Sequence, residues 1–480
     1  MLSFFSLLLF NLSHTKKKSL PQRGDGRRLP PSPPSLPFIG HLHLLGSLPH
    51  RNLRSLAESY GPVVHLRLGP VPAVVVSTAA AAEEALKTRD VSFSGRPRLL
   101  MVDRLFYGCN MALGPYGKYW REARRISVLH LLARAAPPPS AVSGRRSNAI
   151  VSRATFGNGN YRLDGDVGGE KLRHVLADLL ELLAVPPVQE IAPWLWWVDR
   201  LTGRERRTRR TFEALDGLLE RVIADHRRRR SGGRSVGDDD DHRDFVDVLL
   251  DVEETDKAGF KLETDNIKAL ILDMFAAGTD STYMVLEWAM AELINHPDVM
   301  QRLQEDIRGV VGVTGQISED HLHKLPYLKS VVAESLRLHS PASFLPRATT
   351  EDTELLGYHI PKGTRVLINS WAIGRDPVIW ERAEEFVPER FVEAPVDYRK
   401  VGQDFRFLPF GAGRRGCPAA AFGAFSVEMA LTNMLYHFDW ELPESSRKLG
   451  ASFLDMSEAY GLSVRRKAPL LLVAKPWVGA

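Results

Sequence analysis

The chain has 480 residues, 44% of them hydrophobic and 25% charged, and 63 Lys and Arg against 58 Asp and Glu give a net charge of +5. A chain of this length buries a large core, and since no nucleic-acid-binding motif accompanies its mild positive charge, we expect no nucleic-acid partner. Cys109 and Cys417 are the two cysteines, which excludes a disulfide framework and indicates a reducing compartment.

The N-terminus is apolar up to about Leu12 and is followed by three lysines at 16–18. A membrane-spanning helix needs about 20 apolar residues, so residues 1–20 are interpreted as a short hydrophobic segment, a truncated membrane anchor. A cleaved signal peptide is the alternative, but there the positive charge comes first. Residues 21–40 form a basic, proline-rich and therefore stiff hinge, and residues 41–480 form a single domain.

Helical periodicity dominates the middle of the chain, and short apolar runs flank it on both sides. The sequence therefore predicts a mainly α fold with a small β region. Opposite charge runs at 227–230 and 238–241 predict a solvated loop without a function. Strands are predicted at 63–68, 73–76, 355–360 and 365–369, the first two as a hairpin, and a short helix at 79–87.

A long periodic segment begins near Thr264, where Thr264-Asp265 provides an N-cap, and ends at His296-Pro297. Its middle reads Ala-Gly-Thr-Asp-Ser-Thr over 277–282. Small and hydroxyl side chains weaken the helical hydrogen-bond ladder and open a groove for water or dioxygen. Asp280, Ser281 and Thr282 then predict a proton relay, whereas in isolation the segment would indicate helix packing by small residues.

The loop Phe-Gly-Ala-Gly-Arg-Arg-Gly-Cys over 410–417 runs directly into an apolar helical stretch. A thiolate at a helix N-terminus is stabilised by the helix dipole and by unpaired amides. Arg414 and Arg415 place cations beside the sulfur, where they lower its pKa or bind a haem propionate, and Phe410 shields it from water. A sulfur so placed suits axial ligation of haem iron, whereas Cys109 is expected to be structural.

Several motifs resemble those of the cytochrome P450 family, and specifically its microsomal plant A-type clan, and they follow one another along the chain in the same order as in that family. The cysteine loop matches Phe-x-x-Gly-x-Arg-x-Cys-x-Gly, with Ala419 at the last glycine, and Ser281 stands where threonine is usual. The other matching motifs are Trp120-Arg121-Glu122-Ala123-Arg124, Glu334-Ser335-Leu336-Arg337, Pro346-Arg347 and Pro388-Glu389-Arg390-Phe391.

The resemblance implies a cytochrome P450 fold, with haem b between the long oxygen-activation helix and the helix after the cysteine loop. Cys417 would be the axial ligand of the iron, and Asp280, Ser281 and Thr282 would be catalytic. Further residues would bind the cofactor: Trp120, Arg124, Arg347, Phe410, Gly413 and Arg415. A buried triad would brace the cysteine loop: Glu334, Arg337 and Arg390. Substrate contacts would come from Phe106, Ala277, Phe344 and Leu345.

The implied reaction inserts one oxygen atom from O2 into a small hydrophobic molecule, a plant specialised metabolite or xenobiotic. Electrons would come from NADPH through an NADPH-cytochrome P450 reductase. The chain would be a monomer at the endoplasmic reticulum membrane with its body in the cytosol, which the lysines after the apolar segment also favour.

Where the family carries an additional long helix, this chain passes through a proline run at 137–139, so a helix near 133–148 is expected to be missing. Losing that packing could exceed a folding free energy of about 5–15 kcal/mol. Two alternatives therefore stand beside the monooxygenase. One is a haem-thiolate isomerase or dehydratase, against which the acid-alcohol pair argues, and the other is an inactive relative.

Overall fold

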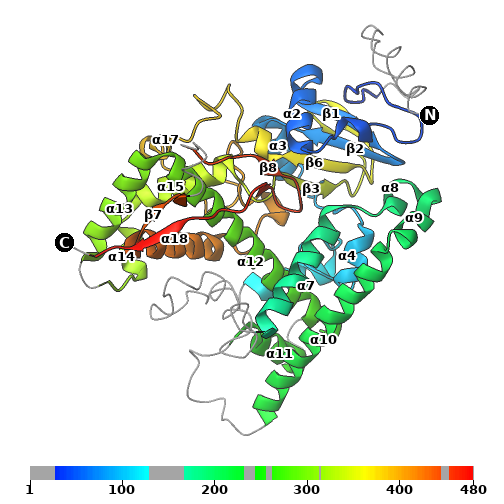
Figure 1. Cartoon of the computed structure of the whole chain (residues 1–480). Coiled ribbons are helices and arrows are strands. Elements are labelled where there is room, and N and C mark those ends of the chain that lie inside the picture. The colour runs from blue at the N-terminus through cyan, green and yellow to red at the C-terminus, as the bar shows by residue number, and fades with distance from the viewer. Residues whose placement is uncertain are drawn as a thin grey trace.

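The structure, a computed structural model, describes residues 27–128, 167–231, 244–255, 262–312, 315–444 and 453–478. A helical body makes up most of the molecule, and a smaller β region lies beside the N-terminal part of the chain (Figure 1). The mainly α fold with a small β region is confirmed. In the part of the chain that the structure describes, no helix is both long and apolar enough to cross a bilayer.

Three predictions fall outside the described residues. These are the hydrophobic segment at 1–20, the acidic run at 238–241 and the missing helix near 133–148.

The β region is built on a four-stranded sheet in the order β1-β2-β6-β3. β1 (Val63–Leu68) and β2 (Val71–Val76) form the predicted hairpin, β6 (Arg365–Asn369) runs parallel to β2, and β3 (Phe344–Ala348) is antiparallel to β6. Apolar side chains pack on both faces of the sheet, because α2 (Pro49–Tyr60) covers one face and α3 (Ala79–Glu83) the other.

The prediction of one strand at 355–360 is wrong. Two short antiparallel strands, β4 (Thr353–Leu355) and β5 (Tyr358–Ile360), occupy the region. Between them Leu356 and Gly357 have φ angles of 48° and 75°. Glycine adopts such a φ without steric cost, so Gly357 lets the chain reverse.

The long predicted helix is confirmed as α12 (Thr264–Asn295), which ends where Pro297 begins α13 (Pro297–Val311). Its cap is Glu263 rather than Thr264 or Asp265. The Glu263 carboxylate accepts the backbone N–H of Asn266, and the Asn266 side chain accepts the N–H of Glu263 at 3.0 Å. This reciprocal pair satisfies two amides that the helix would leave free.

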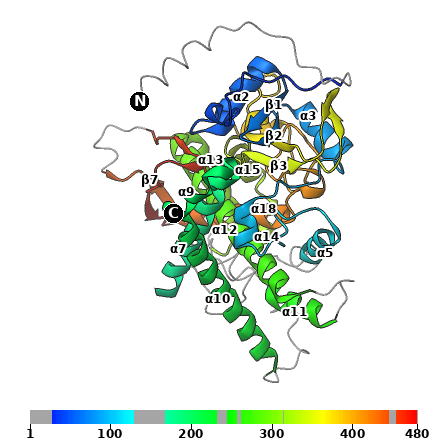
Figure 2. The ribbon, with the colours of Figure 1, turned by 90° about the vertical axis from the view of Figure 1, so that its right-hand side faces the viewer.

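The core around α12 has two halves. Its C-terminal half packs with α13, α15 (Pro326–Leu338) and α18 (Ala420–His437), and its N-terminal half packs with α4, α7, α10 and α11. Figure 2 shows α10 as a long rod that reaches away from the sheet. The remaining helices are α4 (Leu100–Leu105), α5 (Lys118–Ile126), α7 (Val167–Ala184), α8 (Val188–Ile191), α9 (Trp196–Leu201), α10 (Arg204–Ser231), α11 (Phe245–Thr255), α14 (Glu319–His323), α16 (Ser370–Ile373) and α17 (Glu389–Glu393), with short turns η1 (Leu42–Leu44), η2 (Glu84–Thr88), η5 (Pro193–Leu195) and η8 (Gly413–Arg415).

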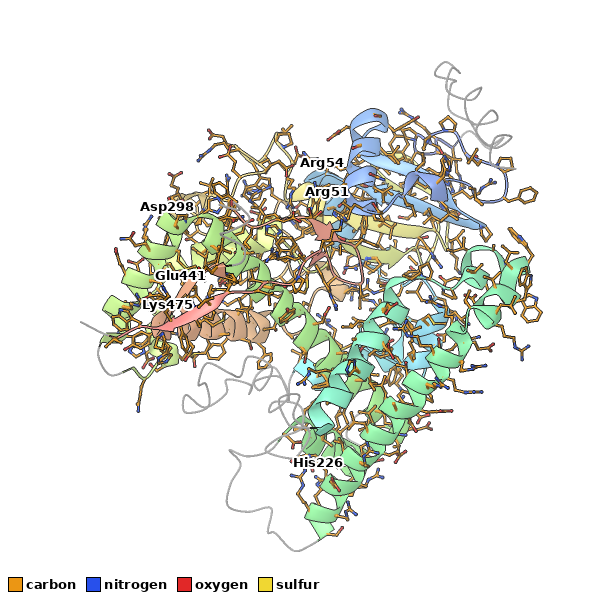
Figure 3. All side chains as sticks on the ribbon, viewed as in Figure 1. Arg51, Arg54, His226, Asp298, Glu441 and Lys475 are labelled. Carbon is orange, nitrogen blue, oxygen red and sulfur yellow. The ribbon has the colours of Figure 1, made fainter. Side chains whose placement is uncertain are left out.

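Two small two-stranded sheets complete the C-terminal part. β7 (Phe438–Glu441) pairs with β10 (Val473–Pro476). Across this pair, Lys475 Nζ lies 2.6 Å from Glu441 Oε1 (Figure 3). β8 (Glu458–Ala459) pairs with β9 (Arg465–Arg466).

The β8–β9 hairpin is tied to the N-terminal part of the chain. The buried carboxylate of Glu458 accepts hydrogen bonds from His50 at 2.9 Å, Arg51 at 2.6 Å and the Trp371 indole at 3.3 Å. Burial alone would raise the pKa of Glu458, but the hydrogen bonds from His50 and Arg51 lower that pKa to about 2. The anchor therefore holds an ionised carboxylate over most of the pH range.

Candidate active site

The cysteine loop is a tight turn closed by its own backbone. The N–H of Cys417 donates to the Phe410 carbonyl at 2.8 Å, and the N–H of Gly416 donates to the Gly413 carbonyl at 2.9 Å. Gly413 has a φ of 67° and lies directly against η2, so a Cβ there would come within 2.4 Å of the Leu86 carbonyl oxygen. The loop thus needs glycine at Gly413 both for its conformation and for its approach to η2.

The Cys417 sulfur lies in a partly buried position before α18. Burial raises the pKa of the Cys417 thiol, while the backbone N–H of Ala419 and the charge of Arg124 act to lower it. Of the two effects predicted for Arg414 and Arg415, lowering of this pKa is not found, because Arg414 pairs with Asp90 at 3.1 Å and the cation that acts on the sulfur is Arg124. A buried thiol of this kind is ionised by coordination to a metal cation.

Arg415 belongs instead to a group of four arginines, the arginine cluster, formed by the buried Arg347 and Arg415 and the half-buried Arg96 and Arg124. Each guanidinium donates to backbone carbonyls: Arg96 to Pro346, Arg124 to Gly416 at 2.8 Å, Arg347 to Ala412 at 3.3 Å, and Arg415 to Ser94 at 2.8 Å and Gly114 at 2.9 Å. In the described ranges, no carboxylate forms an ion pair with any of the four side chains.

The arginine cluster is under electrostatic strain. Burial, together with the charges of Arg347 and Arg124, lowers the pKa of Arg415 to about 9. Burial also lowers the pKa of Arg347 to about 10, with Asp90 opposing and Arg124 reinforcing the shift. The Nη1 atom of Arg415 is buried without a hydrogen-bond partner, although buried polar groups are almost always paired.

These features fit haem b. Buried cations bonded to neutral carbonyls are stabilised by an anionic ligand with several acceptor oxygens, and the two haem propionates supply such oxygens. The propionates would be held by the arginine cluster, and the iron by Cys417. Sequence reasoning missed Arg96, because an arginine before Pro97 has no distinctive spacing from the other motifs.

Trp120 and Phe410 line this region through their rings. The Arg415 guanidinium lies 4.1 Å from the centroid of the Trp120 ring, a cation–π contact that holds the arginine in place. The indole N–H of Trp120 donates to the Met111 carbonyl at 2.8 Å, so its hydrogen-bond partner in this structure is the protein backbone. Phe410 packs against the core cluster that contains Ala424 and Val427 of α18.

The predicted triad comes together, with Glu334 and Arg337 fully buried and Arg390 mostly buried. Arg337 forms two bonds to the Glu334 carboxylate, at 2.7 and 2.8 Å, and Arg390 adds a third at 3.1 Å. Arg337 also donates to the carbonyls of Gly374 and Ala383, both at 2.7 Å. The triad therefore joins α15 to the segment before α17, and Phe391 of α17 contacts Phe407 ahead of the cysteine loop.

The three relay residues lie on successive positions of α12 but do not bond to one another. Asp280 accepts hydrogen bonds from Ser463 at 2.7 Å and from Arg465 at 2.5 Å. The Ser281 hydroxyl donates to the Ala277 carbonyl at 2.7 Å, and Thr282 is buried. Thr279, not among the predicted residues, has a buried hydroxyl without a hydrogen-bond partner. Ser463 and Arg465 were also missed, because nothing in the sequence links positions so far apart.

The predicted substrate contacts lie in different surroundings. Ala277 is exposed in the middle of α12, directly after the buried Ala276 and before the half-buried Gly278, which indicates that it borders an open space. Phe106 is buried beside α12, and Leu345 packs against Gly411 of the cysteine loop. Phe344 instead packs against the sheet cluster with Leu53 and Val64, on the side away from Leu345, because side chains alternate along a strand.

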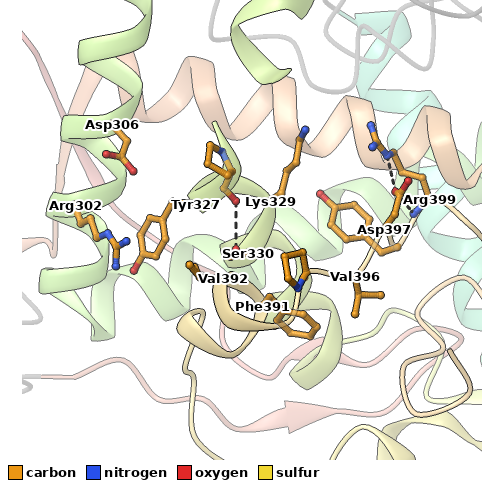
Figure 4. Close-up of a pocket in the computed structure, with 14 residues that line it drawn as sticks. Arg302, Asp306, Tyr327, Lys329, Ser330, Phe391, Val392, Val396, Asp397 and Arg399 are labelled. Atoms are coloured by element: carbon orange, nitrogen blue, oxygen red, sulfur yellow. Dashed lines mark hydrogen bonds and ion pairs between the residues drawn. The ribbon is translucent and has the colours of Figure 1, made fainter. Parts of the chain in front are cut away.

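A surface hollow of about 340 Å³ lies between α13, α15 and the segment 391–399 (Figure 4). Its walls are largely apolar, and Arg302, Asp306 and Lys329 stand at its edge. None of the predicted site residues lines it, so it is separate from the cysteine loop.

Comparison with known proteins agrees with this geometry. The family model of cytochrome P450 matches residues 30–141 and 150–456. Cytochrome P450 71A1 of Persea americana is 45% identical, over 91% of each chain. The (+)-menthofuran synthase of Mentha piperita is 42% identical, over 99% of each chain, and norfluorocurarine oxidase of Strychnos sp is 40% identical, over 93% of this chain and 92% of the relative.

Solved structures show the same fold. A zebra fish cytochrome P450 structure with abiraterone superimposes with a TM-score of 0.73 at 26% identity, over 90% of this chain and all of that one. The chain belongs to the cytochrome P450 family, among its plant A-type members.

Proposed function

We propose that this chain is a haem-thiolate monooxygenase that inserts one oxygen atom from O2 into a small hydrophobic molecule, a plant specialised metabolite or a xenobiotic. The observation that carries the proposal is the arginine cluster beside the Cys417 loop, where buried cations lack an anion. Haem b held by a thiolate supplies oxygen activation and oxygen-atom transfer, and the protein supplies position and polarity.

The chain's own residues have distinct tasks in this reaction. Cys417 would hold the iron, and the arginine cluster would hold the propionates. Asp280 and Ser281 would hold and pass protons at a carboxylate and a hydroxyl, with Thr282 behind them. This acid-alcohol pair favours a monooxygenase over an isomerase or dehydratase, which consumes no dioxygen and needs no proton delivery to it.

Two relatives carry the names (+)-menthofuran synthase and norfluorocurarine oxidase. We infer from them that a small plant metabolite is the substrate here. The apolar surroundings of Phe106 and Leu345 suit such a molecule, because burial of apolar area is the main source of affinity for it.

We also propose that the chain lies on the cytosolic face of the endoplasmic reticulum as a monomer and accepts electrons from an NADPH-dependent reductase. An apolar patch on the structure supports the membrane contact: Phe38, Trp194, Trp196, Trp197 and Leu201 are all at least 46% exposed. The rings of Phe38 and Trp194 lie 6.3 Å apart, so the patch joins η5 and α9 to the N-terminal part of the chain. Exposed aromatic side chains gathered in this way are typical of membrane-contacting surfaces.

The first test is spectroscopic. Protein expressed with a haem supply should show, when reduced under carbon monoxide, the strongly red-shifted Soret band of a thiolate-bound haem. Cys417→Ser should abolish that band, and Cys109→Ser, the matched control, should keep it. An unchanged band in Cys417→Ser would overturn the proposal, and absence of any band in the wild-type protein would favour the inactive relative.

The second test separates the reactions. With a reductase present, a substrate that shifts the Soret band should be converted to a product carrying one more oxygen atom, and only with NADPH and O2. Conversion without either reagent would establish an isomerase or dehydratase instead.

A further inference from the structure

The carboxylate of Asp280 is held from outside its own helix. Its Oδ2 accepts from the Ser463 hydroxyl at 2.7 Å, and its Oδ1 accepts from the Arg465 guanidinium at 2.5 Å. Both donors come from the β8–β9 hairpin, which lies more than 180 positions further along the chain. A carboxylate bonded through both oxygens has a fixed orientation.

The hairpin is rigid where it meets α12. The Trp288 indole N–H, two turns along α12 from Asp280, donates to the Val464 carbonyl at 3.0 Å. The Val464 N–H in turn donates to the Pro341 carbonyl at 3.4 Å, and Glu458 fixes the base of the hairpin. Three consecutive residues, 463 to 465, therefore each form a hydrogen bond with a side chain of α12.

Within α12, nothing that the structure describes competes for Asp280. The Ser281 hydroxyl donates to the Ala277 carbonyl at 2.7 Å, and successive side chains on a helix point about 100° apart. The orientation of the Asp280 carboxylate relative to Ser281 is thus decided by the hairpin and not by the helix.

We propose that Arg465, assisted by Ser463, is a positioning residue for Asp280: the hairpin sets the direction in which this acid passes protons in the oxygen-activation groove. The inference rests on the proposed function. The side chain of Asp280 is 11% exposed and that of Arg465 is 42% exposed, so the coupling free energy of the pair in stability is expected to be small but measurable. Its effect is on geometry, to which proton transfer is sensitive.

The test follows the fate of electrons in the holoenzyme with its reductase. Coupled turnover uses NADPH, a proton, O2 and substrate to give hydroxylated product, NADP⁺ and water. Uncoupled turnover passes the same two electrons to O2 and gives hydrogen peroxide. In Arg465→Ala, product formed per NADPH should fall by about 3- to 10-fold and peroxide should rise correspondingly, while Arg465→Lys should restore most of the coupling.

Two further variants keep the test interpretable. Lys467→Ala removes a positive charge from the exposed next turn of the same segment and should leave coupling unchanged. Ser463→Ala removes only the bond to Oδ2 and should give a smaller loss in the same direction, which remains measurable if Arg465→Ala folds poorly. Unchanged coupling in both Arg465→Ala and Ser463→Ala would overturn the proposal, as would an equal loss in Lys467→Ala.

A readout independent of turnover is a double-mutant cycle on thermal unfolding, followed by circular dichroism, with Asp280→Asn, Arg465→Ala and their combination. The proposal predicts non-additive midpoints, since the two side chains share one interaction. Additive midpoints would overturn it. Because the cycle needs neither substrate nor a haem spectrum, failure of the pair is distinguishable from failure of the monooxygenase assignment.

Discussion

The triad and the arginine cluster both hold arginines largely away from water, and they compensate the cost of burying charge in different ways. In the triad, Arg337 and Arg390 surround the carboxylate of Glu334 at 2.7–3.1 Å, so the charges compensate one another. In the arginine cluster, four guanidinium groups repel one another and bond only to backbone carbonyls. The triad is complete within the chain, whereas the arginine cluster needs an anionic ligand.

The largest expected effect is on the triad. Glu334→Ala leaves two buried cations without their counterion, so unfolding free energy should fall by about 3–5 kcal/mol in urea titrations. The matched control is Glu83→Ala, which removes the exposed partner of Lys87 at 2.6 Å and should cost less than about 0.5 kcal/mol. Similar losses in the two variants would refute the contrast.

Gly413→Ala disturbs the cysteine loop where it contacts η2, without changing any charge. Its φ of 67° and the Cβ approach of 2.4 Å to the Leu86 carbonyl oxygen should cost about 2–4 kcal/mol of folding stability. Gly363 has a φ of 79° but nothing within 4 Å of a Cβ, so Gly363→Ala should show the conformational part alone. Equal midpoints for the two variants in thermal unfolding would mean that the contact with η2 is unimportant.

Arg415→Met tests the claim that the arginine cluster serves a ligand. Removing one of several repelling buried cations should leave the unfolding midpoint of the haem-free protein unchanged or raised. Haem affinity should fall by about 10- to 100-fold, since hydrogen bonds to charged groups are worth about 1.5–3 kcal/mol. Haem titration followed by Soret absorbance measures this.

Arg414→Met is the control for that experiment, because Arg414 pairs with Asp90 at the surface and its loss should spare haem affinity. If Arg415→Met instead unfolds the haem-free protein as Glu334→Ala does, the arginine cluster is structural.

The smallest effect concerns Asp273, a buried acid on α12 whose carboxylate accepts hydrogen bonds from Asn110 and from the backbone N–H of Met111 and Ala112. Burial raises the pKa of Asp273 to about 7, although these bonds oppose the shift. Between about pH 4 and pH 7 the folded protein therefore keeps a proton that the unfolded chain releases. Stability should fall as pH rises through this window and level off above it.

Asp273→Asn removes that pH dependence. The unfolding free energies of wild type and variant are measured in urea at pH 5 and at pH 8. Relative to the wild type, the variant should be more stable at pH 8 than at pH 5 by about 1–3 kcal/mol. Parallel pH profiles would show that the carboxyl group is ionised throughout. This result extends the comparison, because Asp273 is a buried acid that avoids an unpaired charge by keeping its proton, whereas the arginine cluster keeps its charges.

Motifs with short internal spacing were predictable from the sequence. The cysteine loop, the Glu334–Arg337 pair and α12 were found because their residues are neighbours along one turn or one helix. The assignment of Arg390 to the triad came from the family pattern, and the structure confirms it at 3.1 Å.

Contacts that depend on tertiary packing were not predictable. Arg414 turns to Asp90 because η2 lies against the loop, and the cation acting on the Cys417 sulfur is Arg124 from α5. The hairpin that holds Asp280 lies far along the chain. In each case two residues meet only because separate elements pack together, and a sequence motif that contains one of them does not identify its partner.

The Glu458 anchor makes the two ends of the domain depend on each other. His50 and Arg51 belong to α2, yet their carboxylate partner, Glu458, lies more than 400 positions further along the chain. During synthesis the N-terminal helix emerges 408 positions ahead of Glu458, so this anchor cannot form until that residue has been made. A chain that ended before Glu458 would leave His50 buried without its acid and the hairpin without its anchor.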